Sequence, residues 1–258
     1  MSKVYRILSI GPIGSGKSEL CNFIFRENRE NKFTQNEPSC SCSKGPKIFQ
    51  TKRNELNIEI IDFVEYVDDG TDEDNFKTIL DILIDKNSLD LFLFVINSYN
   101  MRFHTDTKNY LKIILNTFTP SEFLNHLAIV FTDCNWLYDS EKNIDILTMQ
   151  LHQFLEEIVD IKNNPNIILP KIYEIDTKKN ENEKYNEKYQ ATIDVLLLNM
   201  EKNFEICGEI STKNIKLDGV KERLEKEEIK FKQTNNENRE IKIKEIINKY
   251  NIYIRTFS

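Results

Sequence analysis

The stretch GPIGSGKS, residues 11–18, holds three of the seven glycines of the chain and lies between two regular patterns. Residues Val4–Ile10 before it are apolar and rich in β-branched residues, as in a buried strand, and Ser18–Phe25 after it has helical spacing. The stretch fits G-x-x-x-x-G-K-[ST] at every fixed position, a motif that cradles phosphate when it joins a strand to a helix. The sequence therefore predicts phosphate binding here, against the alternative of a glycine-rich turn without a ligand.

The residue types in this stretch suit a nucleoside phosphate with Mg²⁺. Around Gly14 and Gly16, backbone N–H groups can turn toward a β-phosphate because no bulky side chain blocks the approach. Lys17 supplies a charge for the β and γ oxygens, which also makes it a candidate catalytic residue, and Ser18 supplies a hydroxyl for the ion. The candidate nucleotide-binding residues here are Gly11, Gly14, Ser15, Gly16, Lys17, Ser18 and Glu19.

The composition of the 258-residue chain is that of a globular, acidic protein. Lys plus Arg number 35 against 42 Asp plus Glu, a net charge of -7, which argues against broad binding to nucleic acid or anionic lipid. The longest apolar run, Leu89–Ile96, is far too short to span a bilayer, and the five cysteines are an odd number, which favours reduced thiols. We expect a cytoplasmic chain without a transmembrane segment, reaching a membrane surface only through partners.

Strand and helix patterns alternate along most of the chain. Such alternation predicts an α/β fold with a mostly parallel six-stranded sheet covered on both faces. The expected strands are Val4–Ile10, Ile48–Lys52, Leu56–Asp62, Leu89–Asn97, Leu127–Thr132 and Lys171–Asp176, the second and third of which could form a hairpin. The expected helices are Ser18–Phe25, Asp72–Ile84, Thr105–Phe118, Ser140–Ile161 and Ala191–Met200.

A helical extension is expected at the C-terminal end. We divide the chain into a nucleotide-binding domain, residues 1–204, and an extension, residues 205–258. Val220, Leu224 and Phe231 stand near heptad spacing, but the pattern stops across Thr234–Asn238, and a coiled coil needs sustained heptads. The extension either binds a protein partner or is a solvated packing helix.

Asp62 is the candidate metal ligand besides Ser18. It ends an apolar strand, where P-loop proteins place a carboxylate for Mg²⁺, although such an Asp can also merely cap a loop. The residues that follow read DFVE, with Glu65 where GTPases have the glycine of D-x-x-G. Ser41, in NEPSCSCSKGP, is the candidate for a third hydroxyl on the ion, with Ser39 and Ser43 as close alternatives.

At this point the sequence resembles a known family. The order GPIGSGKSELCNFIF, LDLFLFVINSYNMRFHTDT and LAIVFTDCNWL is similar to the immunity-associated nucleotide-binding GTPases, the IAN/GIMAP family with the AIG-type G domain, over residues 3–200. The resemblance implies a Ras-like G domain that binds GTP or GDP with Mg²⁺, dimerises across the nucleotide face and in some members hydrolyses GTP slowly. It also implies that Arg102, in MRFHT, either acts on the nucleotide of a dimer partner as a catalytic arginine or is an ordinary surface residue.

Besides DFVE, two loops depart from the GTPase pattern. The base-specificity loop, [TN]-K-x-D in many GTPases or a variant such as F-T-x-x-D in this family, reads FTDCN here, which begins the motif at Thr132 and places Asn135 at the Asp position. Asn offers guanine one acceptor where Asp offers two, which predicts a guanine preference reduced roughly 10- to 100-fold or shifted to another base. The later loop that supports the base is normally F-N-N in this family, whereas Ile175, Asp176 and Thr177 stand there in this chain.

Three functions are consistent with the sequence, and two of them are better supported than the third. The first is a GTP-binding protein with Mg²⁺, nucleotide-controlled assembly as a homodimer, and slow or partner-stimulated hydrolysis. The second is a nucleotide-binding scaffold without turnover, as the changes at Glu65 and Asn135 would suit. An ATPase or small-molecule kinase is weaker, because no arginine-rich lid is evident.

Overall fold

The computed structural model describes residues 3–25, 46–63, 72–98, 105–133, 140–159, 167–176 and 183–211. A six-stranded sheet with strand order β2-β3-β1-β5-β6-β7 forms its centre. Only β2 is antiparallel to its neighbour, β3; the other neighbouring strands are parallel. The strands are β1 Val4–Ile10, β2 Lys47–Arg53, β3 Leu56–Asp62, β5 Leu91–Asn97, β6 Leu127–Thr132 and β7 Lys171–Glu174. The predicted α/β fold with a mostly parallel sheet is confirmed.

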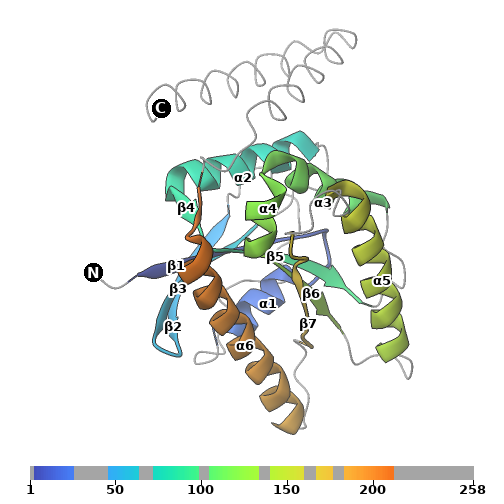
Figure 1. Ribbon diagram of the computed structural model, residues 1–258. Coiled ribbons are helices and arrows are strands. Elements are labelled where there is room, and N and C mark those ends of the chain that lie inside the picture. Colours follow the sequence, from blue (N-terminus) through green and yellow to red (C-terminus); the bar gives the residue numbers. More distant parts are fainter. Residues whose placement is uncertain are drawn as a thin grey trace.

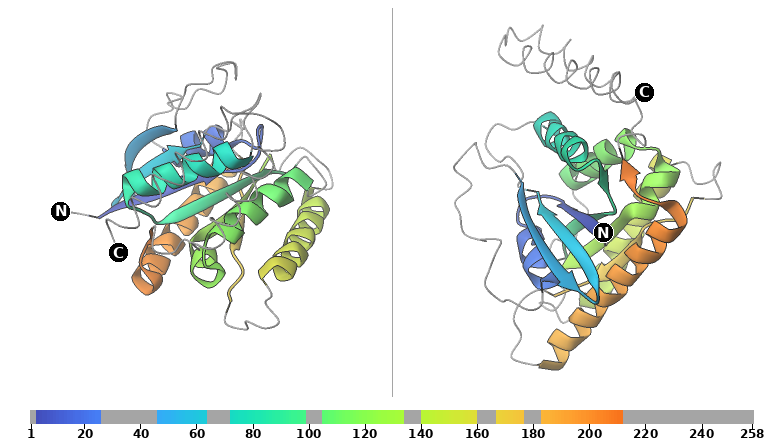
Figure 2. Two further views of the ribbon diagram at one scale, coloured as in Figure 1. Left: turned by 90° about the horizontal axis from the view of Figure 1, so that it is seen from above. Right: turned by 90° about the vertical axis from the view of Figure 1, so that its left-hand side faces the viewer.

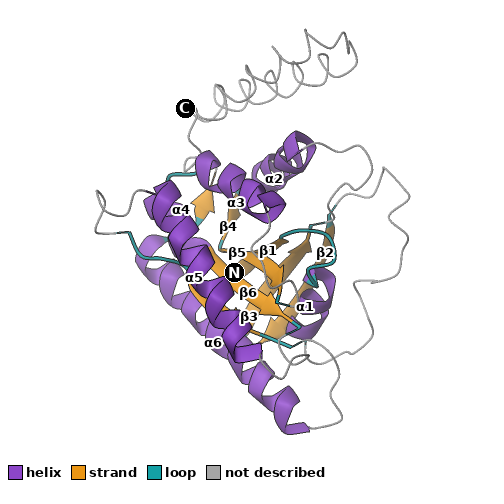
Figure 3. Cartoon of the chain, turned by 90° about the vertical axis from the view of Figure 1, so that its right-hand side faces the viewer, coloured by secondary structure: helices purple, strands orange, loops and turns teal. Residues whose placement is uncertain are grey.

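Helices cover both faces of this sheet (Figure 1 and Figure 3). On one face, strand residues such as Leu8 and Phe94 pack with α2, α3 and α5; on the other, Ile7 and Val95 pack with α1 and α6. Because neighbouring residues of β5 enter opposite cores, this strand is apolar from Leu91 to Ile96 rather than alternating. The helices are α1 Lys17–Ile24, α2 Asp72–Lys86, α3 Thr105–Thr117, α4 Pro120–Phe123, α5 Ser140–Val159 and α6 Glu183–Cys207, with a 3-10 turn at Leu124–His126.

The β2–β3 hairpin lies at the border of the sheet, beside β1 (Figure 2). Asn54 and Glu55 both have positive φ, 49° and 67°, which makes the tight turn between the strands. The buried Arg53 fastens this turn: its guanidinium donates to Asp194 Oδ1 of α6 at 2.8 Å and to the carbonyl of Ile24, at the end of α1, at 3.1 Å. The hairpin is thereby held to α1 and α6, and its second strand carries Asp62.

The expected strand Leu89–Asn97 is divided in two, which corrects its predicted start. Residues Ser88–Leu89 form β4, which pairs with β8, Ile210–Ser211, and β5 begins only at Leu91. The division falls at Asp90, whose carboxylate accepts from the Arg6 backbone N–H at 2.7 Å and meets the Lys3 ammonium at 2.8 Å. The backbone N–H of Asp90 also donates to the Arg6 carbonyl at 2.9 Å, so the break between β4 and β5 lies where Asp90 is held against the start of β1.

The C-terminal part of the described chain continues past the predicted boundary at residue 204. Helix α6 runs to Cys207, and β8 returns to pair with β4. Residues 212–258, most of the predicted extension, lie outside the described residues. The division into two domains stays a prediction.

Candidate functional site

The loop of residues 11–18 lies at the carboxyl edge of the sheet. Asp62 ends β3, Asn97 ends β5 and Thr132 ends β6, and these strands run parallel to β1, which the loop follows. In open α/β sheets this edge is where ligands bind. Chain segments far apart in sequence therefore meet around GPIGSGKS.

Two glycines in the loop are required by close neighbours. Gly11 has φ 139°, and a Cβ there would lie 2.3 Å from the backbone oxygen of Val95. Gly16 has φ 88°, and a Cβ there would lie 3.2 Å from the Thr132 hydroxyl oxygen. The loop thus packs closely against β5 and β6: a side chain at position 11 would collide with backbone, and one at position 16 would be crowded and strained by its positive φ.

Gly16 also begins helix α1 as its N-cap, with no side chain capping the helix. The first N–H groups of a helix have no acceptor within the helix, and they carry the positive end of its dipole. An anion is favoured at such an end, as in phosphate loops. Glu19 lies in the first turn of α1, where a negative charge suits the dipole.

Lys17 places its ammonium at the loop rather than in solvent. The side chain is buried, and Nζ donates to the carbonyl oxygens of Gly11 at 2.7 Å and Pro12 at 2.8 Å. These two bonds hold a positive charge beside the backbone of the loop. The arrangement can stabilise negative charge on a phosphate bound there.

Ser18 and Asp62 form the candidate metal centre. Ser18 Oγ donates to Asp62 Oδ2 at 2.6 Å, while Asp62 Oδ1 is buried without a hydrogen-bond partner. Burial raises the pKa of the Asp62 carboxyl, and the Ser18 hydroxyl and the Lys17 charge oppose that rise. A buried carboxylate oxygen without a partner is costly, and a cation would relieve that cost.

The donor set fits Mg²⁺ better than a metal caged by side chains. Within the described residues, no group of three His, Cys, Asp or Glu side chains could hold a metal ion by itself. Mg²⁺ usually takes one or two protein oxygens together with phosphate oxygens and water. The Ser18 hydroxyl and the Asp62 carboxylate are such a pair.

Thr132 lies behind the loop. Its hydroxyl donates to the Ser15 carbonyl at 2.7 Å, and both residues are almost fully buried. The Thr132 carbonyl accepts from the backbone N–H of Ser98 at 3.0 Å and from its hydroxyl at 2.7 Å. Thr132 therefore contacts the backbone of the loop, a role that the motif did not predict.

Asn97 and Asp133 lie at the site but were not among the predicted site residues. Asn97 Nδ2 lies 2.7 Å from Asp133 Oδ2 and 3.5 Å from the Gly14 carbonyl oxygen. The available signal was position: both residues stand where a buried parallel strand ends, Asn97 on β5 and Asp133 just after β6.

The remaining predicted residues are only partly described. Asp176 is buried, two residues beyond the end of β7, and the residue before it donates its backbone N–H to the carbonyl of Phe131 at 2.9 Å. This places Asp176 at the same edge as Thr132. The predicted residues Ser41, Arg102 and Asn135 lie outside the described residues.

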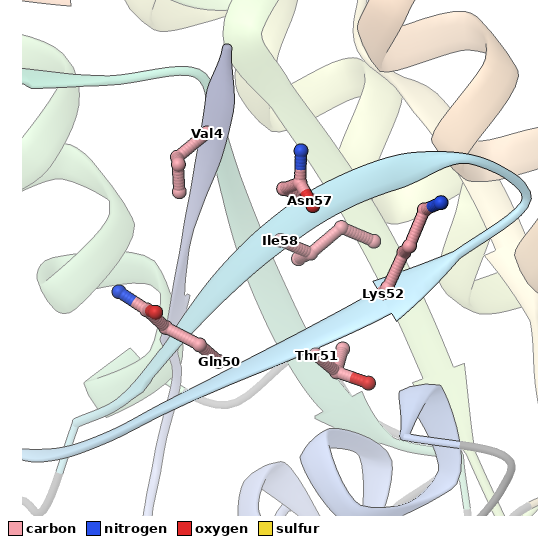
Figure 4. Close-up of a pocket in the computed structure, with 6 residues that line it drawn as sticks. All are labelled: Val4, Gln50, Thr51, Lys52, Asn57 and Ile58. Carbon is pink, nitrogen blue, oxygen red and sulfur yellow. The ribbon is translucent and has the colours of Figure 1, made fainter. Parts of the chain in front are cut away.

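A separate hollow of about 320 Å³ lies near the β2–β3 hairpin (Figure 4). It is lined by Val4, Gln50, Thr51, Lys52, Asn57 and Ile58. Val4 begins β1, whereas the loop of residues 11–18 follows its last residue, so the hollow lies at the opposite end of that strand. It is therefore not part of the phosphate-loop site.

Comparisons with known proteins identify a family for this chain. The family model described as the AIG1 family matches residues 5–216. No curated protein matches the sequence significantly.

In the described part of the chain, every helix is too short or too polar to cross a bilayer.

Similar solved structures include Toc33 from Arabidopsis thaliana in complex with Mg²⁺ and GMPPNP, with 17% identity and a TM-score of 0.61 over 82% of this chain and 89% of that chain. A dimerization-deficient mutant of the same protein gives 15% identity and a TM-score of 0.62, over 81% and 88%. A third structure, from work on dimerization and the GTPase activity of chloroplast translocon components, gives 17% and 0.60, over 78% and 83%. At such identities the likeness concerns the fold.

Proposed function

Since this chain belongs to the AIG1 family, we propose that it binds guanine nucleotide with Mg²⁺ at residues 11–18. The Toc33 structures that it resembles contain Mg²⁺ with GMPPNP or with GDP. In the proposed complex, the backbone of Gly14–Ser18 and the Lys17 ammonium hold the phosphates. Ser18 and Asp62 hold the ion, and residues around Thr132, Asn135 and Asp176 face the base.

One observation carries this proposal more than the motif does. Ser18 donates to one oxygen of Asp62 at 2.6 Å, and the other oxygen is buried without a partner. A carboxylate arranged only to cap a loop would use both oxygens or expose one to water. A divalent cation between this carboxylate and a phosphate would satisfy it, and when bound would neutralise charge on the β and γ phosphates.

We further propose nucleotide-controlled homodimerisation and slow hydrolysis of GTP. Lys17 would stabilise charge on the leaving phosphate, and Arg102 would reach the nucleotide of the partner. Dimerization is described as important for the GTPase activity of atToc33, a neighbour in structure. The competing proposal, a nucleotide-binding scaffold without turnover, draws on Glu65 at the position of the D-x-x-G glycine.

Binding is tested by titration of the full chain with GDP, GTP, XTP and ATP, with and without Mg²⁺. Calorimetry gives the affinities, and Trp136, the only tryptophan, gives an optical signal next to Asn135. We expect Mg²⁺-dependent binding that Lys17→Ala weakens at least 100-fold, since the ammonium meets the phosphates directly. The control is Lys171→Ala, an exposed lysine on β7 that donates to Asn199. Absence of binding by the wild-type chain would refute the proposal.

Turnover is tested by phosphate release at several protein concentrations. If Arg102 acts across a dimer, the specific rate rises with concentration, and Arg102→Ala removes that rise while leaving GDP affinity within about threefold. A specific rate independent of concentration contradicts the role of Arg102. Binding without any phosphate release supports the scaffold.

A further inference from the structure

The ends of β5 and β6 bring two polar side chains to the loop. The Asn97 amide, the Asp133 carboxylate and the Gly14 carbonyl form a polar trio there. Asn97, the last residue of β5, is paired in register with Thr132, the last residue of β6. Asp133 follows with φ 56°, a left-handed conformation that turns the chain sharply after the strand. Its Oδ2 lies 2.7 Å from Asn97 Nδ2, and the same nitrogen lies 3.5 Å from the Gly14 carbonyl oxygen.

The chemistry of the trio depends on which group donates. A carboxylate and a carbonyl only accept hydrogen bonds, whereas an Asn amide nitrogen has two N–H groups. If Thr132 and Asn135 take the first and fourth positions of [TN]-K-x-D, Asp133 stands where that motif has lysine, a residue with three donors. Here the Asn97 amide lies between two acceptors, the Asp133 carboxylate and the Gly14 carbonyl.

We propose that Asn97 is a positioning residue of the nucleotide site: its amide supplies the donor that Asp133 does not, and holds Gly14 and the Asp133 carboxylate in place beside the phosphates. This inference rests on the proposed nucleotide binding. Thr132 holds the next carbonyl of the loop, that of Ser15, at 2.7 Å. Two successive carbonyls thereby face donors at the ends of β5 and β6, the Ser15 carbonyl at the shorter distance, and the N–H of each peptide unit points the opposite way from its carbonyl.

The test uses Asn97→Leu, which keeps the size of the side chain and removes its donors. We expect its affinity for GDP with Mg²⁺ to fall about tenfold, the effect of losing a charge-assisted hydrogen bond. The matched control is Asn199→Leu on α6, which removes an amide bonded to Tyr173 and Lys171 away from the loop. It should bind GDP within twofold of the wild-type chain.

The donor role is tested by Asp133→Lys in the Asn97→Leu background. A lysine at 133 would donate to the Gly14 carbonyl itself and remove the negative charge, so affinity should return to within threefold of wild type. A purely structural role for Asn97 predicts no such rescue, and a loss that the second substitution leaves in place overturns the proposal. So does an affinity of Asn97→Leu within twofold of wild type.

Two further results keep this inference separable from the proposed function. If Asn97→Leu does not fold, Asp133→Lys alone decides: affinity at least equal to wild type supports the donor role, and a loss of tenfold or more overturns it. If the wild-type chain binds GDP and only the Asn97 results fail, the nucleotide site stands and the role of Asn97 falls. If the wild-type chain binds no nucleotide, both fall.

Discussion

Replacement of Thr132 by Val tests how the loop is held. Valine keeps the shape of threonine but removes the hydroxyl that donates to the Ser15 carbonyl at 2.7 Å and lies 3.4 Å from the Ile96 carbonyl. Because Ser15 and Thr132 are almost fully buried, water does not readily replace the lost donor. Leaving a buried acceptor without its partner costs about 1–3 kcal/mol.

This cost must appear in one of two measurements. If the loop keeps its shape, the free energy of unfolding falls by that amount, and the melting temperature drops by about 2–4 °C for each kcal/mol in a chain of this size. If the Ser15 carbonyl instead turns away, the Gly16 N–H turns with it, and GDP affinity falls about 5- to 150-fold. The two losses together should amount to about 1–3 kcal/mol.

The assay is calorimetric titration with GDP and Mg²⁺ beside thermal unfolding of the same samples. Thr132→Ser is the matched control, because it keeps the hydroxyl and removes only a methyl group. We expect Thr132→Ser to retain affinity within about threefold. A Thr132→Val chain with wild-type affinity and a melting temperature within 1 °C of wild type would refute the role of this hydrogen bond.

Three further outcomes follow from the geometry. In denaturant unfolding, Gly11→Ala should lower the free energy of unfolding by about 3 kcal/mol or more, since its Cβ would lie 2.3 Å from a β5 carbonyl oxygen. The control Gly14→Ala, whose Cβ would have no atom within 4 Å, should cost only the strain of its positive φ, about 1–2 kcal/mol. Asp62→Asn should raise the melting temperature of the nucleotide-free chain, because burial raises the pKa of that carboxyl and so disfavours its charged form in the fold. The same variant should lose the gain in GDP affinity on adding Mg²⁺. An unchanged Mg²⁺ dependence would contradict the metal role. Burial lowers the pKa of His126, so the neutral ring is favoured in the fold and stability should fall as pH drops below about 6.5; in His126→Gln, thermal unfolding between pH 7.5 and 5.5 should show a smaller fall.

The phosphate loop could be predicted from the sequence because the residues that form it are consecutive. Glycines spaced with Lys17 and Ser18 between a strand and a helix form a local motif, and glycine is the residue type that adopts the positive φ seen at Gly11 and Gly16 most readily. The strand pattern placed Asp62 at the correct edge for the same reason, because the end of a buried strand is a local feature. The mostly parallel sheet followed from the alternation of strands and helices.

Strand order and register are long-range properties, and the features that depend on them could not be predicted from the sequence. The break at Asp90 depends on Lys3 and Arg6, more than 80 residues away, so a nearly uniform apolar run gave no sign of it. The predicted catalytic and specificity residues Arg102 and Asn135, and the third metal candidate Ser41, lie outside the described residues and stay predictions.

The sequence by itself determined that a phosphate loop joins the first strand to the first helix, because eight consecutive residues specify that loop. The tertiary structure alone decided what holds the loop. Thr132 is 117 positions from Ser15, and Asn97 is 83 from Gly14, so no local pattern relates them. They meet because β1, β5 and β6 are adjacent and parallel, which brings their carboxyl ends together under one loop.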